Sequence, residues 1–139
     1  MDAAQALADL VEISTQIETA VLVDAQGKVA ATNLTDASRA DSLARAARDL
    51  LAAADESMSG SERGEKLVQL QAATPEGCVF VARDDERVVA AVTVPDPTVG
   101  LVFYDLKTCL RHAAGEELAP KPAPRTKAKD DEKGGDGEG

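Results

Sequence analysis

Apolar residues recur along the first 115 positions at two spacings. Spacings of three and four residues predict amphipathic helices, whereas alternation or a short continuous apolar run predicts a strand. Turn-forming residues separate these segments. The pattern predicts, in chain order, helix 3–14, strands 19–24 and 28–33, a helix from Asp36 to about Met58, strands 65–73, 78–82 and 88–94, and a last helix that ends near Ala113.

Local signals mark several ends of these elements. The pair Thr35-Asp36 can cap the second helix, and Gly27 suits a turn with positive φ between the first two strands. Asp96 and Pro97 predict the start of the last helix, with Asp96 as N-cap and Pro97 at the first helical position. Gly115 stands where a left-handed C-terminal cap belongs.

This order of elements indicates an α+β fold. The runs 19–24, 78–82 and 88–94 are apolar almost throughout, so we expect strands that are covered on both faces. Two hairpins joined through a helix predict a five-stranded antiparallel sheet with helices on both faces. The strand 65–73 instead alternates apolar and polar residues. It is therefore expected to be less covered, and an uncovered edge invites pairing with another chain.

The composition changes after Gly115. Residues 116–139 contain prolines at positions 120, 122 and 124, together with seven acidic and five basic residues. Such a segment cannot bury enough apolar area to offset the entropy lost on ordering. The sequence therefore predicts a folded domain over residues 1–115 and a disordered, proline-rich and charged tail over residues 116–139.

Charge and composition exclude several classes of function. The net charge of −10 and the three aromatic residues argue against a nucleic-acid-binding surface. There is no apolar run long enough for a membrane span and no secretory signal. The two cysteines, Cys78 and Cys109, lie in apolar segments, which fits a cytoplasmic protein with small core cysteines.

Residues for catalysis are scarce. The chain has a single histidine, His112, and no glycine-rich phosphate loop, so we expect no catalytic site, no cofactor and no metal site. We interpret His112 as a surface residue in the last turn of the last helix, and the acidic stretch 84–86 as a solvated hairpin tip. Arg45, Arg48 and Arg63 could reach a partner.

The helix 37–56 has an unusually wide apolar face. On a helical wheel its apolar arc spans about 180°, whereas ~100° suffices to cover one sheet. The surplus flank consists of Ala46, Leu50 and Ala53. Because alanines allow a second helix to approach closely, this flank predicts association with another chain.

Four stretches carry a resemblance to a known family: Ala20–Ala31, the helix 37–56, the strand Lys66–Leu70 and the helix from Val99 to Leu106. With the order of elements, they resemble the roadblock family of dynein light chains and small-GTPase regulators. The resemblance covers about residues 3–115 and implies a profilin-like fold. It also implies a non-enzymatic homodimer, or a pair with a paralogue, that binds a small Ras-like GTPase as regulator or scaffold.

In that family the strand that corresponds to 66–73 pairs with its twin across the dimer. Together with the surplus helix flank, this pairing leads us to expect one continuous dimer interface. The expected interface residues are Leu43, Ala46, Ala47, Leu50, Ala53, Ala54, Lys66, Val68, Leu70 and Ala72.

Two other functions stay open, namely a small-molecule sensor and a general adaptor domain of PAS-like or profilin-like architecture. A sensor needs a cavity between sheet and helix. The many alanines and few aromatic residues favour a closed contact there instead.

Overall fold

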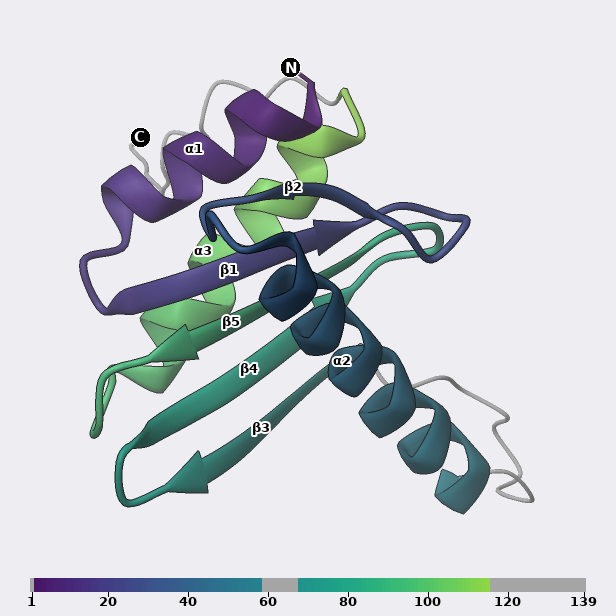
Figure 1. Ribbon diagram of the computed structural model, residues 1–139. Coiled ribbons are helices and arrows are strands. Elements are labelled where there is room, and N and C mark those ends of the chain that lie inside the picture. Colours follow the sequence, from purple (N-terminus) through teal and green to yellow (C-terminus); the bar gives the residue numbers. More distant parts are fainter. Residues whose placement is uncertain (1, 59–67, 116–139) are drawn as a thin grey trace, which may run out of the picture.

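The computed structural model describes residues 2–58 and 68–115, and it confirms the predicted order of three helices and five strands (Figure 1). Residues 116–139, predicted as a disordered tail, lie outside the described residues. The elements are α1 (Ala3–Ile13), β1 (Ile17–Val23), β2 (Val29–Thr32), α2 (Ala37–Met58), β3 (Gln69–Thr74), β4 (Gly77–Arg83), β5 (Val88–Thr93) and α3 (Val99–Ala113).

The strands form one antiparallel sheet in the order β2-β1-β5-β4-β3. The strands β1, β5 and β4 lie in the middle, and β2 and β3 form the two edges. The β1–β5 pair, in which Val21 lies opposite Ala90, thus joins the β1–β2 hairpin to the three-stranded meander β3–β4–β5. The edge position of β3 agrees with its half-polar sequence.

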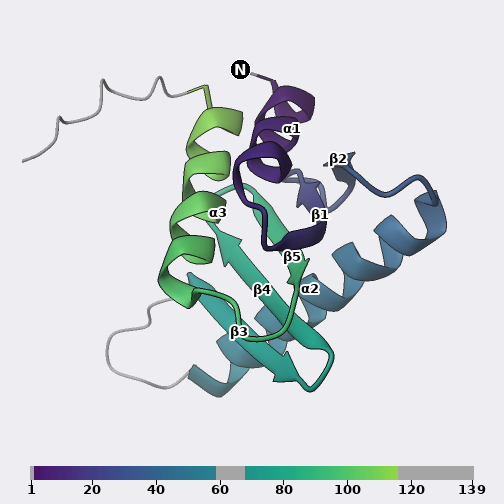
Figure 2. The same cartoon turned by 90° about the vertical axis from the view of Figure 1, so that its left-hand side faces the viewer.

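Helices cover the sheet on opposite sides, as Figure 2 shows. The helices α1 and α3 pack on one face, where Leu22, Phe80 and Leu106 are fully buried. The helix α2 packs on the other face, against Val21 and Val81. Adjacent residues of β1 and β4 therefore enter different cores, which explains the nearly continuous apolar runs in their sequences.

Most predicted end signals are confirmed. The Asp36 carboxylate accepts hydrogen bonds from the N–H groups of Ser38 and Arg39, at 2.9 and 3.4 Å, and so caps α2. Gly27 and Gly115 both have a φ of +84°, a conformation that costs glycine little. The N–H of Gly115 donates to the carbonyl of His112 and closes the end of α3.

The predicted start of α3 is wrong. The helix begins at Val99 with Thr98 as N-cap, and Asp96 has a φ of +55°. The segment before α3 is held by Gln16, whose side-chain oxygen accepts a hydrogen bond from the Thr98 N–H at 2.7 Å. Since Gln16 is distant in sequence, this contact is not visible in the local Asp-Pro pattern.

Two strand starts differ from the prediction by two residues or more. The strand β1 begins at Ile17, two residues early, because Ile17 pairs with Thr93. The strand β3 begins at Gln69 rather than at residue 65. Positions 65–67 lie outside the described residues, and Val68 precedes the strand while its carbonyl still accepts a hydrogen bond from the Arg83 N–H.

The aromatic contact beneath α3 should dominate the stability of that core. Phe80 is fully buried and meets Phe103 edge-on, with ring centroids 5.0 Å apart. We expect Phe80→Ala to lower the free energy of unfolding by about 3–5 kcal/mol, because it removes this contact and leaves a cavity. Tyr104→Ala, at an exposed position of α3, should change it by less than about 0.5 kcal/mol. Urea denaturation of both variants checks the difference.

Candidate protein-interaction site

The helix α2 packs on the sheet through small residues. Ala40, Ala44, Ala47 and Leu51 are buried against the strands, so the helix axis lies close to the sheet. Three of these four residues are alanines, which contact the sheet through a single methyl group each. A helix held in this way covers the sheet with a narrow strip and leaves its wider apolar flank uncovered.

That flank is exposed as the wheel predicts. Ala46 and Ala53 are exposed, Leu50 is 40% exposed, and Leu43 and Ala54 are half-buried. Ala47 was also among the expected interface residues, but it is 1% exposed and belongs to the core of this chain. The wheel gives the width of an apolar arc and not which part of it faces the chain's own sheet.

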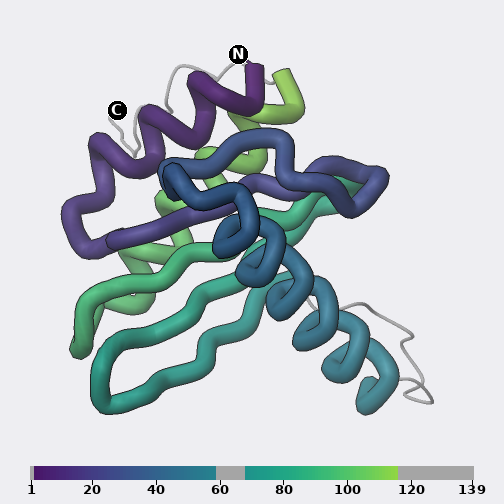
Figure 3. Tube along the Cα trace, in the orientation of Figure 1, coloured from purple at the N-terminus to yellow at the C-terminus, as the bar shows by residue number. Residues whose placement is uncertain are grey.

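The last turns of α2 extend past the β3 edge of the sheet, as the tube in Figure 3 shows. No residue of α2 after Leu51 is buried, and Met58 is 43% exposed. On the same face of the sheet, Ala72 is exposed and Val79 is half-buried. The helix thus projects beyond its own sheet, and part of that sheet has no cover from residues 2–58 and 68–115.

Among the described residues, the backbone of β3 has no partner strand on its outer side. The bond from the Arg83 N–H to the Val68 carbonyl fixes the pattern of the β3–β4 ladder. Bonded pairs alternate along an antiparallel ladder, so residues 70, 72 and 74 direct their N–H and C=O groups towards β4. Those of Gln69, Gln71 and Ala73 consequently point away from the sheet, where another strand could pair with them.

The predicted strand residues lie beside this edge. Leu70 is half-buried and packs in the core beneath α2, Ala72 is exposed, and Val68 is 57% exposed just before the strand. Lys66 lies outside the described residues. Apart from Ala47, the described residues of the expected interface therefore line one surface made by the α2 flank and β3, which we call the α2–β3 surface.

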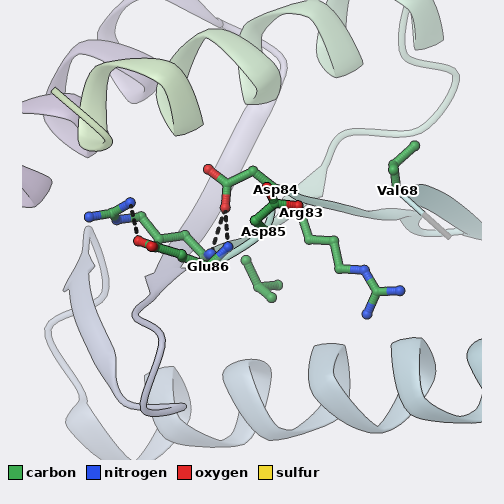
Figure 4. A pocket seen from close by; sticks show the side chains of 7 residues that line it. Val68, Arg83, Asp84, Asp85 and Glu86 are labelled. Atoms are coloured by element: carbon green, nitrogen blue, oxygen red, sulfur yellow. Dashed lines mark hydrogen bonds and ion pairs between the residues drawn. The ribbon is translucent and has the colours of Figure 1, made fainter. Parts of the chain in front are cut away.

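An ion pair at this surface was not foreseen. The Arg83 guanidinium at the end of β4 lies 2.5 Å from the Asp55 carboxylate of α2, and both side chains are largely shielded from solvent. Figure 4 shows Arg83 extending towards α2. The contact ties the projecting part of α2 to the sheet. The two residues are 28 positions apart, and no local spacing predicts such a pair.

The acidic turn beside Arg83 has a structural role. The Asp84 carboxylate accepts hydrogen bonds from the N–H groups of Glu86 and Arg87, at 2.8 and 2.6 Å. A hollow of about 280 Å³ lies between this turn and Val68. Because Asp84 bonds its own turn and Asp85 and Glu86 are solvent-exposed, this agrees with the interpretation of 84–86 as a hairpin tip.

The described residues hold little reactive chemistry. No group of three or more histidine, cysteine or acidic side chains is placed to hold a metal ion within residues 2–58 and 68–115. Cys78 and Cys109 are both buried, and His112 lies in the last turn of α3. Among the helices that the structure describes, none is long and apolar enough to cross a membrane.

Comparison with known proteins agrees with this architecture. The sequence profile of the Roadblock/LC7 domain matches residues 3–93, whereas a search of curated proteins gave no match. A Roadblock/LC7 domain from Streptomyces avermitilis is 17% identical, with a TM-score of 0.74 over 83% of this chain and 97% of that chain.

Two further solved structures share the fold. The gliding protein MglB from Thermus thermophilus is 18% identical, with a TM-score of 0.66 over 81% of this chain and 86% of that one. Myxococcus xanthus MglB is 16% identical, with the same TM-score over 81% of this chain and 92% of that one. At these identities the structures establish the shared fold.

The burial of Cys109 leads to a prediction about thiol reactivity. Burial, and to a smaller extent the nearby Asp9 carboxylate, raise the pKa of the Cys109 thiol from 9.0 to about 12. Since the thiolate is the reactive form, Cys109 in the folded protein should react with a thiol reagent far more slowly at about pH 8 than in the unfolded chain. The raised pKa also stabilises the fold below about pH 9, and this contribution should be lost as the pH rises towards 12.

Mass spectrometry after timed labelling, with and without denaturant, checks this expectation. Rapid modification of Cys109 in the folded protein would show that the site between α1 and α3 opens readily.

Proposed function

Because the chain belongs to the Roadblock/LC7 domain family, we propose that it forms a symmetric dimer, with itself or with a paralogue, that binds a small Ras-like GTPase and regulates or scaffolds it. The observation that carries this proposal is the open β3 edge beside the exposed flank of α2. The family resemblance supplies the class of partner. A roadblock domain acts by contact, in keeping with the scarcity of reactive groups in the described residues.

A two-fold arrangement would give both the α2 flank and the β3 edge a partner. In an isologous contact the same patch is used twice, so the outward backbone groups of Gln69, Gln71 and Ala73 would pair with those of a second β3. The projecting end of each α2 would then lie over the uncovered part of the partner's sheet. The alanines of the flank, Ala46 and Ala53, would let the two helices approach closely, with Leu50 between them.

Of the two alternatives, the small-molecule sensor fits the geometry less well. A small-molecule sensor needs an interior cavity, but both faces of the sheet are filled by residues such as Leu22, Phe80 and Val81, which are fully buried. A general adaptor would use the same α2–β3 surface for a different class of protein. Binding experiments with a GTPase separate the adaptor from the proposed function.

The dimer predicts opposite outcomes for two charge changes on α2. Leu50→Glu places a carboxylate in the apolar contact of each subunit, where desolvation and like-charge repulsion oppose association. We expect this variant to sediment as a monomer. Arg48→Glu, on the polar side of the same helix, should sediment as the wild type does. A wild-type monomer, or a Leu50→Glu variant that stays dimeric, would contradict the proposal.

A change in β3 tests the strand pairing separately. Gln71→Pro removes an outward N–H that the proposed ladder needs, and an edge strand tolerates proline at such a position. We expect the variant to fold, as judged by circular dichroism, and to sediment mainly as a monomer. Gln71→Ala retains the N–H and should remain dimeric. Equal assembly of the two variants would show that β3 does not pair.

The functional prediction concerns the nucleotide state of the partner. The chain itself has no GxxxxGK[ST] loop and should bind no nucleotide in that manner. Contacts shift a GTPase between states only if they favour one of them. We therefore expect this protein to bind one nucleotide form of a small Ras-like GTPase more tightly than the other. The test is a titration with a GTPase encoded beside this gene, loaded either with the diphosphate or with a triphosphate analogue.

Parallel hydrolysis assays distinguish the two roles. Preference for the triphosphate form with faster hydrolysis identifies an activating partner, and equal binding without acceleration identifies a scaffold. Leu50→Glu is the matched test of whether the dimer is required, with Arg48→Glu as its control. Absence of binding in both nucleotide states would contradict the proposed function.

A further inference from the structure

A second apolar surface lies at the opposite edge of the sheet. Here α1 runs beside β2, and the two elements enclose a groove of about 470 Å³. Its wall contains one charged side chain, that of Glu12, and β2 is an edge strand whose outer side has no neighbour among the described residues. The lining residues are Ala4, Leu7, Ala8, Val11, Glu12, Ala31, Thr32 and Asn33.

The two uncharged polar side chains of this groove already have partners. The Thr32 hydroxyl donates to the Ala20 carbonyl and accepts from the Leu34 N–H. The Asn33 amide accepts from the Ala20 N–H and donates to the Glu18 carbonyl. A small polar ligand is oriented by a few free polar groups, and among the side chains of this groove only the Glu12 carboxylate could serve in that way. Its chemistry instead suits an apolar stretch of polypeptide.

The chain itself provides such a stretch close to the groove. Ala113, at the end of α3, and Ala3, at the start of α1, pack against the same core. Figure 2 shows the end of α3 beside this end of α1, where the groove begins. Six of the ten residues 116–125 are apolar, whereas residues 126–139 contain one apolar side chain other than glycine. The six are Leu118, Ala119, Pro120, Pro122, Ala123 and Pro124.

The distances permit this segment to enter the groove. The groove follows α1 from Ala4 to Glu12, or roughly 12 Å at 1.5 Å per residue. Passing around the helix end adds about 10 Å, the diameter of a helix. Ten residues in a proline-rich extended conformation span roughly 31 Å. Residues 116–119 are therefore enough to reach the groove, and 120–125 are enough to follow it.

We propose that residues 116–125 fold back into the groove between α1 and β2 and cover the β2 edge. The prolines need no hydrogen-bond acceptor, and their restricted backbone lowers the entropy lost on docking. Arg125, at the far end of the docked stretch, would lie near the Glu12 carboxylate, a favourable pairing of charges. A segment with too little apolar area to fold alone can still be ordered by a preformed surface.

Such docking has a consequence for assembly. The sheet has two edges, and a chain that pairs at both would form an open-ended fibre instead of a closed dimer. A covered β2 edge would restrict strand pairing to β3. The docking itself does not depend on the proposed dimer or on a GTPase, so it can fail or succeed independently of them.

Paramagnetic relaxation enhancement in the full-length chain tests the docking. Ala123→Cys provides a thiol in the segment for a nitroxide label, while Cys78 and Cys109 are buried. We expect the label to weaken the amide signals of Ala8 to Glu12 and of Ala31 to Asn33. Ala8→Lys, which adds a positive charge to the groove at an exposed helical position, should restore these signals.

Ile13→Lys is the matched control, because it adds the same charge to α1 outside this groove at an exposed position. It should leave the signal loss unchanged. A loss of equal size with Ala8→Lys would reflect tethering alone and would overturn the docking, as would the absence of any loss in the groove. A mixture of spin-labelled chains with unlabelled, isotope-enriched chains shows whether the signal loss arises between chains. If it arises only between chains, the segment docks on a second copy and the proposal is wrong.

Discussion

The close contact between α2 and the sheet determines how this domain can interact. Three buried alanines and Leu51 form that contact, and so few small groups cover only a narrow strip. Because these side chains are few and small, the rest of the apolar flank of α2 and part of the sheet are left uncovered by the described residues. Larger residues at the contact would lift the helix, widen its cover and close the α2–β3 surface. The same residues that complete one core therefore leave a second surface incomplete.

The Arg83–Asp55 ion pair complements this packing. Alanine methyl groups fix the separation of a helix from a sheet but resist rotation of the helix only weakly. A charge contact between β4 and the projecting part of α2 adds a directional constraint at the place where packing ends. The interaction surface is thus positioned by apolar contact along half of the helix and by a partly shielded ion pair along the other half.

The sequence was sufficient to predict the order of elements, the strands with two covered faces, and the caps at Asp36 and Gly115, because each depends on periodicity or on a neighbouring backbone group. The start of α3 was mispredicted because Gln16, far away in sequence, holds Thr98. Ala47 was assigned to the exposed side because helical periodicity does not give the direction of the sheet. The groove beside β2 left no local signal, since α1 and β2 meet there only through the tertiary fold.

Ala3 and Ala113 pack against the same core, and the two ends of the folded unit lie side by side, at the side of the molecule away from β3 (Figure 2). Adjacent ends of this kind allow a domain to be inserted into a loop of another protein with little distortion of the host. A roadblock unit transferred in this way would keep its β3 edge directed away from the host. Two such hosts could then be joined through the inserted domains, which makes this fold suitable as a transplantable connector.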